Sequence, residues 1–202
     1  MLSLETILLL LLGYLVGSIP WALIIGKVFY KTDIREHGSG NLGGTNAGRV
    51  LGKKAGAIVM ALDILKAFFV VLIIAQFNQD VAAMSGLACA IGHSYPIFAK
   101  FKGGKAVATT VGYLLGVSLF VSNQFILLFV VPVVVFLVLL KLFKMVSLAS
   151  ISAVSIAAIL SFFQPNNIVF YCLVVTALFV IFRHRENIQR IRNKEEKKIT
   201  WM

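Results

Sequence analysis

Two glycine-rich segments contain the residue types that could bind phosphate groups. The first, residues 33–49, places glycines among hydroxyl and amide side chains and ends on a basic residue. Its members of these types are Gly38, Ser39, Gly40, Asn41, Gly43, Gly44, Thr45, Asn46, Gly48 and Arg49. The second, residues 101–110, contains Gly103 and Gly104 followed directly by Lys105. Glycines let backbone N–H groups converge on an anion, and a helix that starts beside them adds its positive dipole end. A helical pattern follows each segment, so the sequence predicts a site with two anion pockets.

Neither segment fits a nucleotide-binding motif. Gly38-x-Gly40-x-x-Gly43 formally matches the dinucleotide fingerprint, but it follows an apolar helical stretch rather than the strand of a βαβ unit. Lys105 is followed by Ala106 rather than by Ser or Thr, which excludes a P-loop. For either segment taken alone, a basic interfacial turn that anchors two membrane spans stays an open alternative.

A third polar segment continues the last apolar stretch of the chain. His184 and Asn187 are three positions apart, which places them on one face of a helix. A basic amphipathic tail that lies on anionic lipid stays an alternative. The histidines do not occur at the spacings of a metal site, and we expect neither a metal ion nor a cofactor.

The elements that position these segments are strongly apolar. Hydrophobic residues make up 59% of the chain and charged residues 13%, which is rare in soluble domains. About 20 apolar residues are needed to cross a bilayer as a helix. The sequence therefore predicts an all-α integral membrane protein, a single transmembrane domain over 1–202 with seven spans. They are residues 4–25, 55–77, 81–98, 106–121, 125–140, 146–163 and 168–182.

The basic residues predict how the chain is oriented in the membrane. All of the 19 Lys and Arg except Lys66 lie in or beside alternate connections or in the carboxyl-terminal tail. Basic residues in short loops mark the cytoplasmic side. We therefore expect the amino terminus outside, the carboxyl terminus in the cytoplasm, and all three polar segments on the cytoplasmic face. The net charge of +11 suits anionic headgroups and anionic substrates at that face, and we expect no nucleic acid partner.

Two charged residues, Asp63 and Lys66, fall at membrane depth. Their i, i+3 spacing on one helix allows them to form an ion pair. We favour a structural pair over a proton relay, on the expectation that no acidic or histidine partner lines the other spans. Cys89 and Cys172 fall inside predicted helices, and no disulfide is expected.

Several motifs occur together in a fixed order. They are Gly17-Ser-Ile-Pro20, residues 38–46 with Arg49, Gly92-His-x-x-Pro96 with residues 101–110, and His184-x-Glu-Asn187. Together they resemble the bacterial acyl-phosphate:glycerol-3-phosphate acyltransferase family, the PlsY type, over nearly the whole chain. That family usually has alanine where this chain has Gly44, a departure that should not disturb a glycine-type anion loop.

The resemblance implies a seven-helix enzyme of phospholipid synthesis in the bacterial cytoplasmic (inner) membrane, with its active site on the cytoplasmic face. It implies transfer of a fatty acyl group from acyl phosphate to the 1-hydroxyl of glycerol 3-phosphate, giving lysophosphatidic acid and phosphate. The implied partners are these two substrates, membrane lipids and, as an open possibility, the enzyme that forms acyl phosphate. The implied catalytic residues are Ser39, His184 and Asn187. The implied substrate-binding residues are Ser39, Asn41, Gly43, Gly44, Thr45, Asn46, Arg49, Gly103, Gly104, Lys105, Ser147, His184 and Asn187.

The residues also limit the mechanism. No His-x-x-x-x-Asp pair and no nucleophile elbow occurs in the chain. An acyl phosphate is an already activated mixed anhydride, so we favour direct transfer in which a substrate phosphate oxygen takes the hydroxyl proton. His184 is the alternative base, and a covalent acyl-Ser39 intermediate is the less favoured route. A transporter of phosphate esters is the alternative function, although polar residues gather at one face rather than at the midplane.

Overall fold

The computed structural model describes residues 3–199, and within that range the chain forms helices and no strand. The prediction of an all-α fold is therefore confirmed for this part of the chain. The α-helices are α1 Leu4–Gly17, α2 Trp21–Tyr30, α3 Gly44–Val50, α4 Lys53–Ala75, α5 Gln79–Ser94, α6 Val107–Phe120, α7 Val131–Phe143, α8 Val146–Leu160, α9 Asn167–Arg183 and α10 Arg185–Arg192. Short helical turns cover Ile34–Glu36, Ile97–Ala99 and Ser161–Phe163, and a π-helical segment covers Ile126–Val130.

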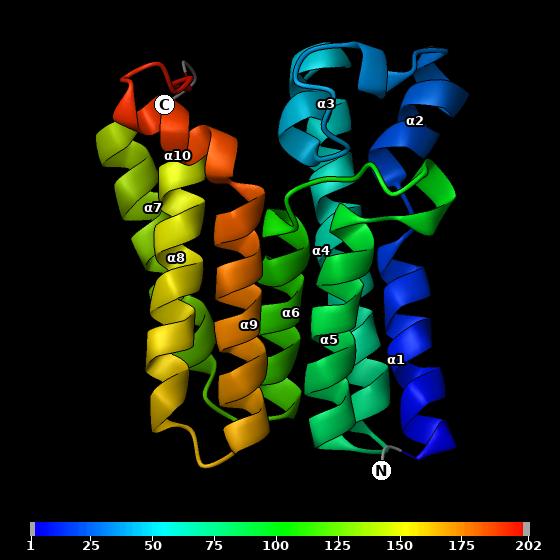
Figure 1. The fold of residues 1–202 in the computed structure, drawn as a ribbon, viewed down its shortest axis with the longest axis vertical. Coiled ribbons are helices and arrows are strands. Elements are labelled where there is room, and N and C mark those ends of the chain that lie inside the picture. The colour runs from blue at the N-terminus through cyan, green and yellow to red at the C-terminus, as the bar shows by residue number, and fades with distance from the viewer. Residues whose placement is uncertain (1–2, 200–202) are drawn as a thin grey trace.

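The long helices stand side by side in one bundle (Figure 1). Helix α4 packs against α5 and α6, α1 packs against α5, and α8 lies between α7 and α9. The main core fills the space between α4, α5, α6 and α9, where Val71, Tyr113, Val117 and Leu173 are buried. Many large apolar side chains instead point outward and are exposed. A bundle whose outer surface faces lipid has this distribution, because lipid tails are as apolar as the side chains.

Among the described residues, five helical segments are long and apolar enough to cross a membrane, and a sixth is added if α9 and α10, bent by 59°, count as one. Helix α6 is apolar but shorter than these. Seven spans and the side on which each terminus lies therefore stay predictions. The connections that contain the basic residues lie together in space. The connection from α2 to α4, the approach to α6, the α7–α8 turn and α10 lie at one end of the bundle, and α1 begins at the other (Figure 1).

The first apolar stretch differs from its predicted form. A span over residues 4–25 was expected. Leu4–Tyr30 is one of the candidate spans, but it consists of two helices, because α1 ends at Gly17 and α2 begins at Trp21 and continues to Tyr30. Pro20 has no N–H to donate to a continuous helix, which explains the break. Gly17 lies so close to α5 that a Cβ there would collide with the backbone of Cys89. At the break, the carbonyl of Ile19 accepts the N–H of Trp21 at 3.2 Å instead of the N–H of a residue one helical turn further on.

Candidate active site

The first glycine-rich segment is held in shape by one buried amide. The Oδ1 atom of Asn46 accepts a hydrogen bond from the backbone N–H of Ser39 at 2.9 Å. Its Nδ2 atom donates to the carbonyl oxygens of Ile34 at 3.3 Å, His37 at 3.2 Å and Asn41 at 3.1 Å. Asn46 is only 2% exposed. The side chain of Asn46 therefore organises the loop, and the substrate contact that the sequence suggested for Asn46 stays a prediction.

The glycines of this segment serve three different purposes. Gly38 has a φ of +66°, and a Cβ there would collide with Oδ1 of Asn46. Gly44 starts α3 and brings it against α4, since a Cβ would lie 2.9 Å from the carbonyl oxygen of Gly56. Around Gly43 a Cβ would meet no atom within 4 Å. Open space for a ligand is therefore found at Gly43 and not at the other two.

The polar side chains of the first segment that could reach a ligand lie on its outer side. Ser39, Thr45 and Arg49 are exposed, and Asn41 is half-buried. Within residues 3–199, none of the side chains of Ser39, Thr45 and Arg49 forms a hydrogen bond or an ion pair. The segment also leads into a helix, α3, as its sequence predicted. These three side chains are therefore available to an anionic substrate.

The second glycine-rich segment is buried against other parts of the bundle. The N–H of Gly104 donates to the carbonyl of His93 at 3.2 Å, and the carbonyl of Gly104 accepts from the Arg183 guanidinium at 3.1 Å. A Cβ on Gly104 would collide with the imidazole of His93, and a Cβ on Gly103 would collide with the His93 carbonyl. The sequence suggested that these glycines line an anion pocket. On the side where a Cβ would project, the structure instead places His93.

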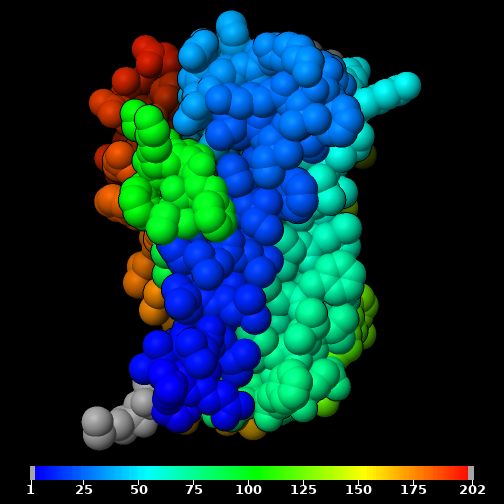
Figure 2. All heavy atoms as spheres, turned by 90° about the vertical axis from the view of Figure 1, so that its right-hand side faces the viewer, coloured from blue at the N-terminus to red at the C-terminus, as the bar shows by residue number. Residues whose placement is uncertain are grey.

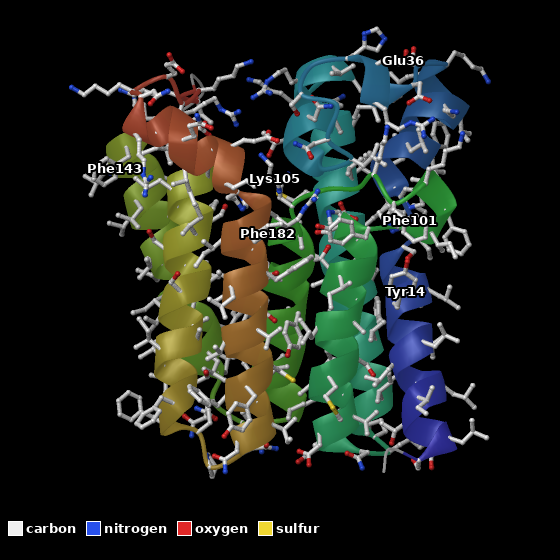
Figure 3. All side chains as sticks on the ribbon, in the orientation of Figure 1. Tyr14, Glu36, Phe101, Lys105, Phe143 and Phe182 are labelled. Atoms are coloured by element: carbon white, nitrogen blue, oxygen red, sulfur yellow. The ribbon has the colours of Figure 1, made fainter. Side chains whose placement is uncertain are left out.

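Lys105 follows these glycines and turns toward the carboxyl-terminal helix. Its ammonium group donates a hydrogen bond to Oδ1 of Asn187. Figure 3 draws Lys105 between α3 and α10, at the end of the bundle that also carries the first segment. Burial lowers the pKa of the Lys105 ammonium, and the charge of Arg190 lowers it further. An anion bound beside Lys105 would relieve both effects, since it would stabilise the charged form.

His184 lies at the bend between α9 and α10. It is 3% exposed, and its Nδ1 atom is 2.8 Å from the carbonyl oxygen of Val180. With Nδ1–H donating to that carbonyl, the lone pair resides on Nε2. Burial lowers the pKa of His184 to about 4. The imidazole is therefore neutral at neutral pH, and Nε2 is able to accept a proton.

The structure adds one residue that the sequence analysis missed, Glu196. Its carboxylate accepts hydrogen bonds from Ser147 Oγ and Asn187 Nδ2, both at 2.6 Å, and from Arg190 Nε at 2.9 Å. Partial burial raises the pKa of Glu196, but these three donors outweigh that effect and lower the pKa overall. An acidic side chain in a basic tail was the only signal in the sequence, and it gave no indication of its distant partners.

The carboxyl-terminal tail returns to the bundle to bring Glu196 there. Lys194 adopts a left-handed conformation with φ of +62°, and the N–H of Ile199 donates to the carbonyl of Lys144 at 2.8 Å. Ser147 and Asn187 were expected to contact substrate, but their side chains are engaged with Glu196 and, for Asn187, also with Lys105. We therefore expect both to act by holding these charged groups in place.

The predicted site residues thus form two groups at one end of the bundle. One group is connected by hydrogen bonds and comprises the predicted residues Lys105, Asn187 and Ser147 together with Glu196, which was not predicted. The other is the first glycine-rich segment. No hydrogen bond or ion pair within residues 3–199 joins the two groups. A substrate with charged groups at both ends could bridge them, and this is the arrangement that a transfer between two phosphorylated molecules requires.

An apolar groove opens on the outside of the bundle at the break in the first span. It is lined by Ile19, Pro20, Leu23, Ile24, Lys27, Val28 and Phe98. Figure 2 shows this side of the molecule, where residues 95–105 lie against the chain around the break and α2. Among the described residues that line the groove, Lys27 alone carries a charge. Such a surface suits an aliphatic chain whose polar end lies near the basic end of the bundle.

The chain is similar to known proteins over almost its whole length. The family model described as glycerol-3-phosphate acyltransferase matches residues 7–194. The glycerol-3-phosphate acyltransferase of Listeria monocytogenes serovar 1/2a is 51% identical and aligns over 99% of this chain and 100% of its own length. The enzyme of the same name from Bacillus subtilis is 47% identical over 96% of this chain and 98% of its own.

Solved structures show the same likeness in three dimensions. The crystal structure of PlsY, an integral membrane glycerol 3-phosphate acyltransferase, in its glycerol 3-phosphate form superposes with a TM-score of 0.87 at 38% identity. The match covers 97% of this chain and 96% of that one. The lysophosphatidic acid form of PlsY superposes with a TM-score of 0.84, also at 38% identity.

Proposed function

Because the chain belongs to the glycerol-3-phosphate acyltransferase family, we propose that it moves a fatty acyl group from acyl phosphate to the 1-hydroxyl of glycerol 3-phosphate. The products are lysophosphatidic acid and inorganic phosphate. One observation carries the proposal: an available cation, Arg49, and a half-buried cation, Lys105, lie on two glycine-rich segments at the same end of an apolar bundle. Both substrates carry phosphate, and the donor also has an acyl chain that stays in lipid.

We assign the binding roles accordingly. Arg49 and Lys105 each hold a substrate phosphate, and Ser39 donates a hydrogen bond to substrate from the exposed side of the first segment. Asn187 orients Lys105, and His184 faces the glycerol end. The apolar groove beside Pro20 is the proposed place for the acyl chain. The site then faces the cytoplasm, where glycerol 3-phosphate is dissolved, and the protein resides in the bacterial inner membrane.

The proposed chemistry is a single displacement at the carbonyl carbon of the donor. The hydroxyl oxygen of glycerol 3-phosphate forms the new ester bond, the bond from the carbonyl carbon to the phosphate oxygen breaks, and phosphate leaves. A substrate phosphate oxygen accepts the hydroxyl proton. The protein contributes by holding the reactants together and by placing cations near the negative charge that develops. Ser39 has no positioned base among the described residues that would make it a nucleophile.

The test is a two-substrate assay with purified protein in detergent, using acyl phosphate and labelled glycerol 3-phosphate. We expect lysophosphatidic acid and inorganic phosphate in equal amounts, and initial-rate lines that intersect. Incubation with acyl phosphate alone should leave the intact mass of the protein unchanged. An acylated Ser39 peptide that forms as fast as turnover would replace direct transfer by a two-step route. Absence of lysophosphatidic acid with active donor present would refute the proposed function itself.

A further inference from the structure

Three ionisable side chains meet in the buried centre of the bundle. The Lys66 ammonium is 2.8 Å from Oδ1 of Asp63, so the predicted ion pair is present. His93 of α5 joins them, with Nδ1 at 3.3 Å from that carboxylate oxygen and 3.0 Å from the Lys66 ammonium. The expectation that no histidine faces this pair was wrong, because the last turn of α5 brings His93 against α4. All three residues are buried.

The outer edge of the same imidazole supports the second glycine-rich segment. The position that a Cβ on Gly104 would take overlaps Nε2 of His93 and lies close to two carbons of the ring. The backbone of His93 also accepts the N–H of Gly104 at 3.2 Å. The next residue in the chain is Lys105. A movement of the His93 ring would therefore move the peptide from which the Lys105 side chain extends.

The inner edge of the network reaches the break in the first span. The Lys66 ammonium donates to the carbonyl of Ile19 at 3.2 Å, and the N–H of Trp21 donates to the same carbonyl at 3.2 Å. Helix α2 follows that break and leads directly into the first glycine-rich segment. The buried network thus contacts the chain just before one basic segment and supports the other, although it lies apart from the proposed substrate contacts.

We propose that His93, held by Asp63 and Lys66, is a positioning residue for acyl transfer. Its ring is the surface on which Gly104 lies, and it thereby fixes the direction of Lys105. This inference rests on the proposed function for its kinetic consequences, but its structural consequence is independent of activity. A purely structural ion pair would stabilise the bundle without setting the position of Lys105.

A double-mutant cycle tests the contact between ring and glycine. Gly104→Ala should lower kcat/KM for glycerol 3-phosphate by about 100-fold, since a misplacement of about 1 Å has an effect of that size. His93→Asn keeps a polar group near Nδ1 and removes the ring edge that faces Gly104, and should lower kcat/KM by about 10-fold through a higher KM. The double variant should be about 10-fold more active than Gly104→Ala, because the added methyl group then has space.

Gly48→Ala is the matched control, because its Cβ would lie an ordinary 3.6 Å from the nearest atom. It should keep near wild-type activity. Effects that multiply in the double variant, or a folded His93→Asn protein with wild-type kcat and KM, would overturn the proposal. Inactive wild-type protein would refute the proposed function instead.

Hydrogen exchange tests the inference without an activity assay. In His93→Asn, amides of residues 101–106 should exchange at least about 10-fold faster, because the support of the Gly104 peptide is lost. Amides of residues 37–41 in the first segment should keep their wild-type rates and thus serve as the internal reference. Unchanged exchange over residues 101–106 would contradict the role of His93, whether or not the protein transfers acyl groups.

Discussion

The two glycine-rich segments are similar in composition but are held in place by different means. In the first, the Asn46 amide binds backbone groups that are all within 12 positions along the chain. In the second, Arg183 and Asn187 bind Gly104 and Lys105 from 79 and 82 positions away. The shape of the first segment therefore depends on local residues, whereas that of the second depends on the assembled bundle.

The cations of the two segments differ in the same way. Arg49 is exposed, so water and salt screen its charge. Lys105 is half-buried, and burial has already lowered the pKa of its ammonium. A charge interacts more strongly in a medium of lower dielectric constant. Lys105 should therefore contribute more to the reaction than the exposed Arg49.

Removal of the Lys105 charge should have the largest effect. Lys105→Ala should lower kcat/KM by about 100- to 1,000-fold, the range seen when one group that stabilises developing negative charge is removed. Lys102→Ala is the matched control from the same segment, since Lys102 is exposed, and it should change kcat/KM less than about 3-fold. Steady-state kinetics with both substrates varied measures this difference. Equal losses in the two variants would show that net charge, and not the placement of Lys105, matters.

The tail carboxylate should come next, through stability as well as activity. Glu196→Ala leaves Ser147, Asn187 and Arg190 without their acceptor, and each hydrogen bond to a charged group contributes about 1.5–3 kcal/mol. We expect a lower midpoint of thermal unfolding in detergent and a loss of roughly 10- to 100-fold in kcat/KM, because Asn187 no longer holds Lys105.

Glu195→Ala is the control for that change, because Glu195 is exposed and adjacent in the chain. It should unfold at the wild-type temperature. The pKa of Glu196 is lowered in the folded protein, so its contribution is present above the ordinary pKa of a glutamate and is lost as pH falls through the lowered value. The difference between wild type and Glu196→Ala should accordingly shrink in acid, and a constant difference would contradict the role of its charge.

The amide of the first segment should have a smaller and more local effect. Asn46→Ala removes one acceptor and two donors that satisfy four backbone groups, so amides over residues 37–41 should exchange faster. We expect kcat/KM to fall by about 10-fold, while residues 101–106 keep their exchange rates. Faster exchange in both segments would show that they are coupled and would weaken the contrast between them.

These contrasts also show what could be predicted from the sequence. Periodicity and charge are local properties of a sequence. They were sufficient to predict the helical class, the spacing of the basic connections and the Asp63–Lys66 pair. The two glycine-rich segments could be recognised because their glycines and basic residues lie close together in the sequence. The break at Pro20 could also have been predicted, since proline disrupts a helix, but it was not.

Other features depend on which helices become neighbours. The position of His93 beneath Gly104 requires α5 and the approach to α6 to meet, and no spacing along the chain encodes that contact. Glu196 reaches Ser147 only because the tail turns back over α8. His93 and Glu196 are both ionisable, so the sequence identifies them as polar residues. Their partners appear only in the assembled fold.

The last prediction concerns the pH dependence and separates the two candidate bases, one from the substrate and one from the bend of α9. A base acts in its deprotonated form, so the rate falls as pH drops through its pKa. A phosphate monoester has a second pKa of about 6. Burial lowers the pKa of His184 to about 4, so this residue would stay deprotonated over most of the accessible range. We expect a limb near pH 6, with kcat lower by about 10-fold at pH 5 than at pH 7.

His184→Asn completes the comparison, because an amide can still donate to the Val180 carbonyl while no titrating group remains. With a phosphate as the base, this variant should have a lower rate but keep its limb near pH 6. If wild-type activity instead persists down to about pH 4 and falls only there, and if this fall near pH 4 is absent from His184→Asn, then His184 is the base. In that case the substrate phosphates serve only for binding, and the difference between the two segments concerns affinity rather than proton transfer.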